Sequence, residues 1–406
     1  MASGGHLTRE EQSIQSPRPR NICISVNMPA TALPFSYFDV PTAAPLGIAE
    51  LMPGARNLMD YASVRSGERV LILAEHPTDP VVIQALVAAA AYRDADVQVL
   101  SVAPFSPGGW DRENPGERSI AEAAHGRADV VITCTWWAEV HCQPLFFSQV
   151  AQKGVRFVSL HMAATAACLN TGARLPPQVY YAIMRRAAEI MGSGEDIRLQ
   201  TSLGTDITFK NVSLTADNGP LVPGGWRPFP YGGVNFYPGA CDGVFIVEES
   251  TATGVPEERL AVTVTDNIVT EIEGGAAAEQ LRRYGPLGYY MRHALLGVNP
   301  KVRLAGGAQF EREKHAGAFY LGIDGLTEDG VADPSQPGYA HCDCQFDRPT
   351  IKVGNTVISE AGRLVILDEP EIRQVASRFG PPEVVLDDNP QMILPRRYTG
   401  GALNQE

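Results

Sequence analysis

The chain has 406 residues, of which 44% are hydrophobic and 19% charged, so two domains with large cores are expected and a disordered protein is excluded. The formal net charge of −13 argues against nonspecific nucleic-acid binding, which needs a basic face. The seven cysteines are scattered without a zinc-binding spacing, and no signal peptide or apolar run of roughly 18 residues is visible. We therefore expect a cytoplasmic protein with reduced thiols, which binds neither nucleic acid nor membrane.

The first half of the sequence alternates between strand and helix patterns. Residues 1–20 are polar and predict a flexible tail. The stretch 69–102 then has an apolar run, an alanine-rich amphipathic segment and a second apolar run. This order predicts a β-α-β unit and hence a parallel sheet. A second such unit is expected from a helix near 118–125, a strand at 128–135, a helical region and a strand at 155–161.

The pattern changes after a helix predicted at 177–191 and a glycine-containing junction, GSGED. Short runs of alternating polar and apolar residues follow, which predict antiparallel strands with one helix near 276–284. The expected fold is an N-terminal α/β domain with a parallel sheet (21–195), followed by a mainly antiparallel α+β domain (196–406). Neither GxGxxG nor a Walker motif is present, so no nucleotide-binding site is expected.

The stretch GYAHCDCQFDRPTI (338–351) contains the most informative short pattern. In a strand, His341 and Asp343 share one face, while Cys342 and Cys344 share the other. A carboxylate on a buried face needs a compensating partner. Before any resemblance is considered, that partner could be an arginine, a water network or a metal ion.

Histidines supply the other candidate ligands. His293, His315 and His341 all lie in the predicted antiparallel half. Together with Asp343 they could form a set of two histidines and one carboxylate, with His315 as an extra ligand, which suits a divalent first-row metal. The remaining histidines are expected to be surface or hydrogen-bonded residues: His6, His76, His125, His141 and His161. Two of them, His76 and His161, are kept as substrate-side candidates.

The order of motifs after residue 200 resembles a known superfamily. The segments are GTDITFK, GGVNFYPGACDGVFIVEES, VTDNIVTEIEGG, MRHALLGVNP, HAGAFYLGIDG and HCDCQFDRPTIKVGNTVISEAGRLV. They resemble the thermophilic aminopeptidase (S/T type) metallopeptidases, whose superfamily includes 2,5-dihydroxypyridine dioxygenases and 5-nitroanthranilic acid aminohydrolases. The resemblance spans roughly residues 50 to 370 and implies a metal-dependent, homo-oligomeric enzyme.

The resemblance assigns roles to individual residues. It implies that His341 and Asp343 are metal ligands and that His315 matches a ligand of the two-metal aminopeptidases. His293 falls where those aminopeptidases have a glutamate and the ring-cleaving dioxygenases have a histidine. A histidine at this position favours one divalent metal ion, held by His293, His341 and Asp343. Manganese is the preferred metal, with iron or zinc as alternatives.

Two departures from the aminopeptidase pattern support a single metal. The stretch that lines up with a further aminopeptidase glutamate, GGVNFYP (232–238), contains no carboxylate. The aminopeptidase tyrosine, a serine in the dioxygenases, falls at Gly322. Both departures argue against two-metal peptidase chemistry.

Three enzyme activities follow from the resemblance. The first is hydrolytic deamination of an electron-poor aromatic amine, 5-nitroanthranilate, by a metal-bound water acting with His315. The alternatives are iron-dependent cleavage of a dihydroxypyridine ring and, second, aminopeptidase activity. A binding protein or a subunit with an inactive metal site remains a non-enzyme alternative, which metal content would distinguish.

Substrate contacts are predicted from both halves. Arg292 and Arg348 could bind nitro or carboxylate groups. In a regular strand Arg292 would point away from His293, and the alternative is then a surface ion pair. Trp136 and Trp137 follow a strand of the α/β half, where ligands often bind; packing in the core is the alternative. The aromatic stretch 224–239 is expected to be a rigid loop that walls a flat ring, or else a packed loop or an oligomer contact.

Overall fold

The computed structural model of the chain describes residues 47–76, 78–102, 127–134, 154–160, 165–216, 219–230, 232–304, 309–330 and 340–388. The predicted tail and the predicted helix at 118–125 lie outside these residues. So do the candidate site residues Trp136, Trp137 and His161, and the three histidines expected to have no role in the site: His6, His125 and His141.

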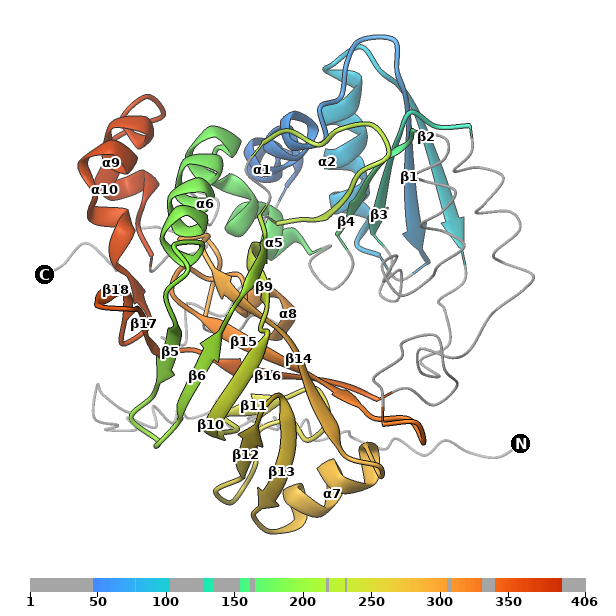
Figure 1. Cartoon of the computed structure of the whole chain (residues 1–406). Helices are drawn as coiled ribbons and strands as arrows, with labels where there is room; N and C mark the ends of the chain where they lie inside the picture. The colour runs from blue at the N-terminus through green and yellow to red at the C-terminus, as the bar shows by residue number, and fades with distance from the viewer. Residues whose placement is uncertain are drawn as a thin grey trace, which may run out of the picture. The chain divides into compact units, whose positions relative to one another are not determined.

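The first half forms a five-stranded sheet in which every pair of neighbouring strands is parallel. Its strand order is β2-β1-β3-β4-β8 (Figure 1). The strands are β1 (Arg69–Glu75), β2 (Asp96–Val102), β3 (Val130–Cys134), β4 (Arg156–Ser159) and β8 (Trp226–Pro228). Three of its strands are buried almost throughout, as expected for a parallel sheet. The predicted parallel sheet is thereby confirmed.

Helices of the first half follow from local signals in the sequence. Asp79 caps helix α2 (Pro80–Ala91) by accepting the backbone N–H of Val81 at 2.9 Å, and proline at the first helical position favours this start. In α6 (Pro177–Met191), Val179, Ile183 and Ala187 lie four residues apart on the buried face. The other helical segments are α1 (Ile48–Tyr61), α5 (Ala166–Asn170) and η4 (Gly172–Arg174).

The second half forms a sheet of fourteen strands within the described residues, and its neighbouring strands are antiparallel. The strands are β5 (Ile197–Gln200), β6 (Asp206–Lys210), β7 (Ser213–Thr215), β9 (Gly233–Tyr237), β10 (Ala240–Ile246), β11 (Glu249–Ser250), β12 (Ala261–Thr265), β13 (Ile268–Glu273), β14 (Tyr289–Gly297), β15 (Phe319–Gly325), β16 (His341–Phe346), β17 (Thr350–Val353), β18 (Thr356–Glu360) and β19 (Arg363–Leu364). Antiparallel structure was predicted for this half and is confirmed.

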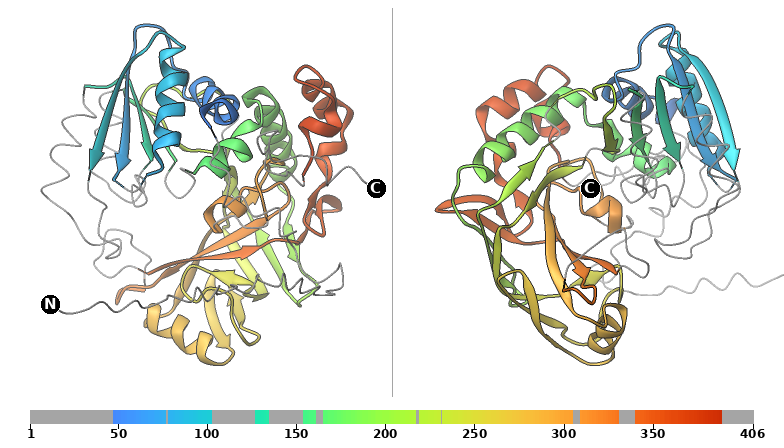
Figure 2. Two further views of the ribbon diagram at one scale, coloured as in Figure 1. Left: turned by 180° about the vertical axis from the view of Figure 1, so that it is seen from behind. Right: turned by 45° about the vertical axis from the view of Figure 1, so that its right-hand side comes forward.

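The second half also contains more helix than its sequence pattern predicts. The predicted helix at 276–284 is α7 (Ala276–Tyr284), which lies beside β12 and β13 in each view (Figure 1 and Figure 2). Four short helical segments were not predicted: α8 (Gln309–Arg312), η5 (Val365–Asp368), α9 (Pro370–Ala376) and α10 (Pro382–Val385). No helix among the described residues is long and apolar enough to cross a membrane.

The aromatic stretch 224–239 connects the two sheets instead of forming a loop. Its first part is β8, which pairs with β4 of the parallel sheet. Its later part is β9, which pairs with β14 of the antiparallel sheet. The loop prediction for this stretch is therefore wrong. The boundary predicted near residue 195 remains a prediction.

Candidate metal centre

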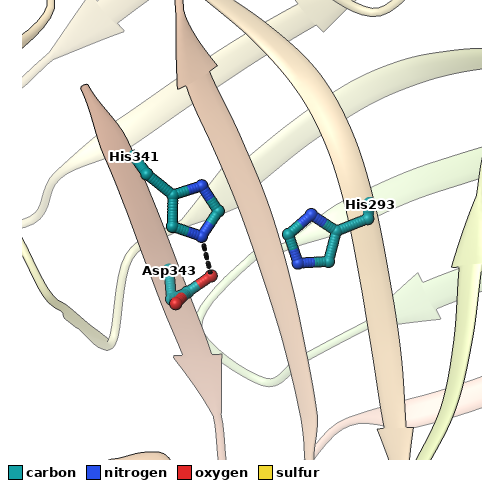
Figure 3. A group of neighbouring side chains, drawn as sticks. All are labelled: His293, His341 and Asp343. Carbon is teal, nitrogen blue, oxygen red and sulfur yellow. Dashed lines mark ion pairs between the residues drawn. The ribbon is translucent and has the colours of Figure 1, made fainter. Parts of the chain in front are cut away.

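Three side chains from two strands converge on one face of the antiparallel sheet. They are His293 of β14 and both His341 and Asp343 of β16, with β15 between the two strands (Figure 3). One potential ligand atom from each residue lies within 4.8 Å of the other two. Strand alternation places Cys342 and Cys344 on the opposite face, where both are fully buried.

A β-bulge in β14 brings His293 to this face. Met291 lies opposite Ile323 of β15, but the next paired residue is His293, opposite Gly322. Arg292 is therefore an extra residue, and a bulge of this kind interrupts the alternation of faces. The prediction that Arg292 points away assumed a regular strand. With the bulge, Arg292 Nε instead lies 3.7 Å from Oδ2 of Asp324, beside the site.

Gly322 makes room for the His293 ring. A Cβ atom at Gly322 would lie 2.4 Å from Cε1 and 2.7 Å from Nδ1 of His293. Gly322 is also paired with Asp343 on the other side of β15. The imidazole of His293 thus lies over β15, on the side toward His341 and Asp343 of β16.

His341 lies between two carboxylates. Its Nδ1 is 2.6 Å from Oδ1 of Asp324, and its Nε2 is 3.1 Å from Oδ1 of Asp343. Burial alone would lower the pKa of His341, but the charges of Asp343 and Asp324 and their hydrogen bonds raise the pKa well above its ordinary value. Burial alone would raise the pKa of Asp343, but the charge and the hydrogen bond of His341 outweigh this effect and lower the pKa. Without a metal, the His341 imidazole is thus held between the carboxyl groups of Asp324 and Asp343 in a largely buried cluster.

His293 has the opposite electrostatic character. Its ring is parallel to that of His341 within 3°, with 5.5 Å between the ring centroids. Burial lowers the pKa of His293 to about 4, and the charge of His341 adds to this effect. His293 is therefore neutral at neutral pH, which is the form that binds metals. Tyr320 places its hydroxyl 3.0 Å from Nε2 of His293.

The donor set fits a transition-metal ion. Two imidazoles and one carboxylate with open positions are typical of non-haem iron(II) sites. Ligands about 2.1 Å from one ion lie roughly 3–4 Å from each other, and the observed spread of at most 4.8 Å is close to this range. The residues present can therefore hold one ion after a small adjustment.

His315 lies outside this group of three. It is buried, and its Nδ1 is 2.7 Å from the carbonyl oxygen of Val302. A bridge between the backbones of His315 and Asn299 fixes this segment. The part predicted for His315 in metal binding and catalysis stays a prediction.

Two of the other predicted contacts, Arg348 and His76, lie within the described residues. Arg348 is exposed in the turn after β16, at the end of that strand remote from His341. His76 is exposed in the turn that follows β1. Trp136 and Trp137 lie outside the described residues, so their predicted contacts remain untested.

Four polar residues beside the site were not predicted as functional residues: Tyr320, Asp324, Glu313 and Lys314. Glu313 and Lys314 are both buried and form an ion pair. Burial raises the pKa of Glu313 to about 7, against the opposing effect of Lys314, and the charge of Asp343 adds to the rise. The alternation in FYLGIDG, which puts Tyr320, Gly322 and Asp324 on one face, was a signal that could have identified two of these residues.

Comparisons with known proteins identify relatives of this chain. A family model described as 2,5-dihydroxypyridine 5,6-dioxygenase matches residues 50–366. The solved 2,5-dihydroxypyridine dioxygenase of Pseudomonas putida KT2440 is similar at 18% sequence identity and a TM-score of 0.61, covering 81% of this chain and 99% of that chain. Wild-type AmpT from Thermus thermophilus is similar at 12% identity and a TM-score of 0.52, covering 79% and 100% respectively. No curated protein matches the sequence.

These matches support the predicted superfamily but none of them points to an aminohydrolase. The two structural similarities, at low sequence identity, establish the fold alone. The family model carries more weight because it spans most of the chain. On that ground, the chain belongs to the 2,5-dihydroxypyridine 5,6-dioxygenase family.

Proposed function

We propose that this protein is an iron(II)-dependent dioxygenase that opens a hydroxylated pyridine ring, with 2,5-dihydroxypyridine as the first substrate to test. The observation that carries the proposal is the convergence of His293, His341 and Asp343 on one face of the sheet, in a chain whose family model has this description. Iron bound by these residues would supply the redox chemistry by which molecular oxygen reacts with the ring.

The chain's own residues would prepare the site for a planar, hydroxylated substrate. Tyr237, at the end of β9, is exposed, and its ring centroid lies 6.2 Å from that of His293. It offers an aromatic surface against which a flat ring can pack. The hydroxyl of Tyr320 and the exposed guanidinium of Arg292 provide hydrogen-bond donors beside the same histidines.

The hydrolytic alternative has less support. Deamination of 5-nitroanthranilate was the activity first expected from the sequence, with manganese as the metal. The family match favours the dioxygenase instead, and a two-histidine, one-carboxylate set suits iron(II). His315 lies outside the group of three, so the described residues give no support to a second metal or to aminopeptidase activity. A cytoplasmic location and a homo-oligomer remain part of the proposal.

An oxygen-uptake assay tests the proposal. Protein loaded with Fe²⁺ under anaerobic conditions is mixed with 2,5-dihydroxypyridine and oxygen. The oxygen concentration and the absorbance of the ring are then followed. We expect one oxygen molecule consumed per ring lost, with no uptake by His341→Ala and normal uptake by Cys342→Ala. No uptake, combined with ammonia release from 5-nitroanthranilate by the Mn²⁺-loaded protein without oxygen, would establish the hydrolase instead.

A further inference from the structure

We infer that Asp324 is a positioning residue that holds His341 with Nε2 free to bind the metal ion. This inference rests on the proposed metal site. Asp324 of β15 is paired with His341 of β16 and is completely buried. Its Oδ1 lies 2.6 Å from Nδ1 of His341, which is a short hydrogen bond even for a charged partner.

The chemistry of a carboxylate determines which nitrogen of His341 carries the proton. An ionised carboxylate only accepts hydrogen bonds, so Nδ1 must be the donor. In a neutral imidazole this leaves the lone pair on Nε2, the nitrogen that faces Asp343. Histidines that bind metals commonly donate their other ring N–H to such a group.

The backbone around His341 is fixed from the other side of β16. The hydroxyl of Tyr284 donates to the carbonyl oxygen of His341 at 3.1 Å. Thr251 donates its N–H to the carbonyl of Asp343 and accepts the N–H of Asp343 on its hydroxyl, both at 3.0 Å. With the backbone held by these contacts, the ring orientation of His341 is the remaining freedom, and Asp324 restricts it.

Arg292 compensates the charge of the buried carboxylate. Oδ2 of Asp324 accepts no hydrogen bond from the described residues, and Arg292 Nε lies 3.7 Å away. An uncompensated carboxylate would be costly at a fully buried position. The bulge in β14 therefore has two effects: it places His293 beside the β16 pair, and it brings Arg292 to Asp324. The ion pair with Asp324 therefore gives Arg292 a role beside the metal site.

Metal affinity distinguishes positioning from a purely structural role. In Asp324→Asn the amide has nearly the same shape, but its NH₂ group can donate to Nδ1 and favour the tautomer with the proton on Nε2. We expect the dissociation constant for Co²⁺, followed by visible absorption, to rise about 10- to 100-fold. Asp206→Asn removes a surface carboxylate paired with Arg198 and is the matched control, with no change expected. A dissociation constant for Asp324→Asn within about twofold of wild type would overturn the inference.

A second measurement needs no variant at this position. In the Zn²⁺-loaded wild-type protein, nitrogen-15 NMR of the histidines should show a proton on Nδ1 of His341, assigned by its loss in His341→Ala. A proton on Nε2 instead would overturn the inference even if Asp324→Asn failed to fold.

The outcomes separate this inference from the proposed function. Wild-type protein that binds Co²⁺ tightly but neither consumes oxygen nor opens the ring would contradict the dioxygenase, while weaker binding by Asp324→Asn would still support the inference. Wild-type protein with no Co²⁺ binding would overturn both the metal site and the inference.

Discussion

Gly322 and His293 occupy adjacent positions on β15 and β14, and the histidine ring lies where a side chain at 322 would begin. A Cβ at Gly322 would approach Cε1 of His293 to 2.4 Å, a separation that real Cβ contacts do not show. Because Gly322 also pairs with Asp343, any side chain here would disturb the centre of the candidate metal site.

Gly322→Ala should therefore displace His293 and weaken metal binding by at least about tenfold. The overpacking should cost about 1–3 kcal/mol of unfolding free energy, so the protein should remain folded. Metal titration and thermal unfolding test this expectation. Gly219→Ala is the control, because a Cβ there meets nothing within 4 Å. Unchanged metal affinity in Gly322→Ala would mean that His293 is not a ligand.

The two faces of β16 should respond differently to truncation. His341→Ala and Asp343→Ala should lose metal and nearly all turnover while retaining the fold. Cys342→Ala and Cys344→Ala should keep stoichiometric metal, since both thiols are buried on the opposite face, and should lose only about 1 kcal/mol of stability each. Metal analysis of the four purified variants checks this contrast, and loss of metal from a cysteine variant would mean that the wrong face has been assigned.

The metal-free protein should lose stability between about pH 6.5 and pH 4 in part because of His293. Its pKa is about 4 in the folded protein and about 6.5 in an unfolded chain. Over this range the unfolded chain binds the extra proton, so the free energy of unfolding falls as pH falls. Urea unfolding of metal-free wild type and His293→Asn at several pH values measures this effect. The variant should show a shallower slope, and identical slopes would contradict the lowered pKa.

Metal removal should lower the thermal stability of the wild-type protein. Since the ion binds only the folded site, a concentration 100 times the dissociation constant adds about 2.7 kcal/mol to the free energy of unfolding. Differential scanning calorimetry with Zn²⁺ and with a chelator should show a shift of several degrees, and His341→Ala should show none. An equal shift in that variant would place the stabilising ion at another site.

Local sequence signals predict much of the fold. The β-α-β unit of β1, α2 and β2 could be predicted because its apolar runs, the cap at Asp79 and the alanine-rich helix are all local features. The bounds of α6 and α7 also agree with the prediction. In contrast, β8 joins the parallel sheet by pairing with β4, about 70 residues earlier. The pattern of its three residues does not indicate which strand it pairs with.

The candidate site could be predicted only in part, for a related reason. The alternation of His341 and Asp343 with two cysteines is visible in the sequence, and so is the separate His293. The bulge at Arg292 depends on the register between β14 and β15, which no short pattern specifies. The position of His315 depends on close packing, because a Cβ at Gly297 would lie 2.2 Å from the carbonyl oxygen of His315. Asp324 was missed because its partner His341 lies on another strand.

Isotope labelling tests the central claim most directly. The Fe²⁺-loaded protein is supplied with 2,5-dihydroxypyridine and ¹⁸O₂ in unlabelled water, and the product is analysed by mass spectrometry. A dioxygenase that uses the His293–His341–Asp343 site should place both labelled oxygen atoms in a ring-opened product, and His341→Ala should yield none. An intact ring, or a product whose new oxygen comes only from water, would contradict the account.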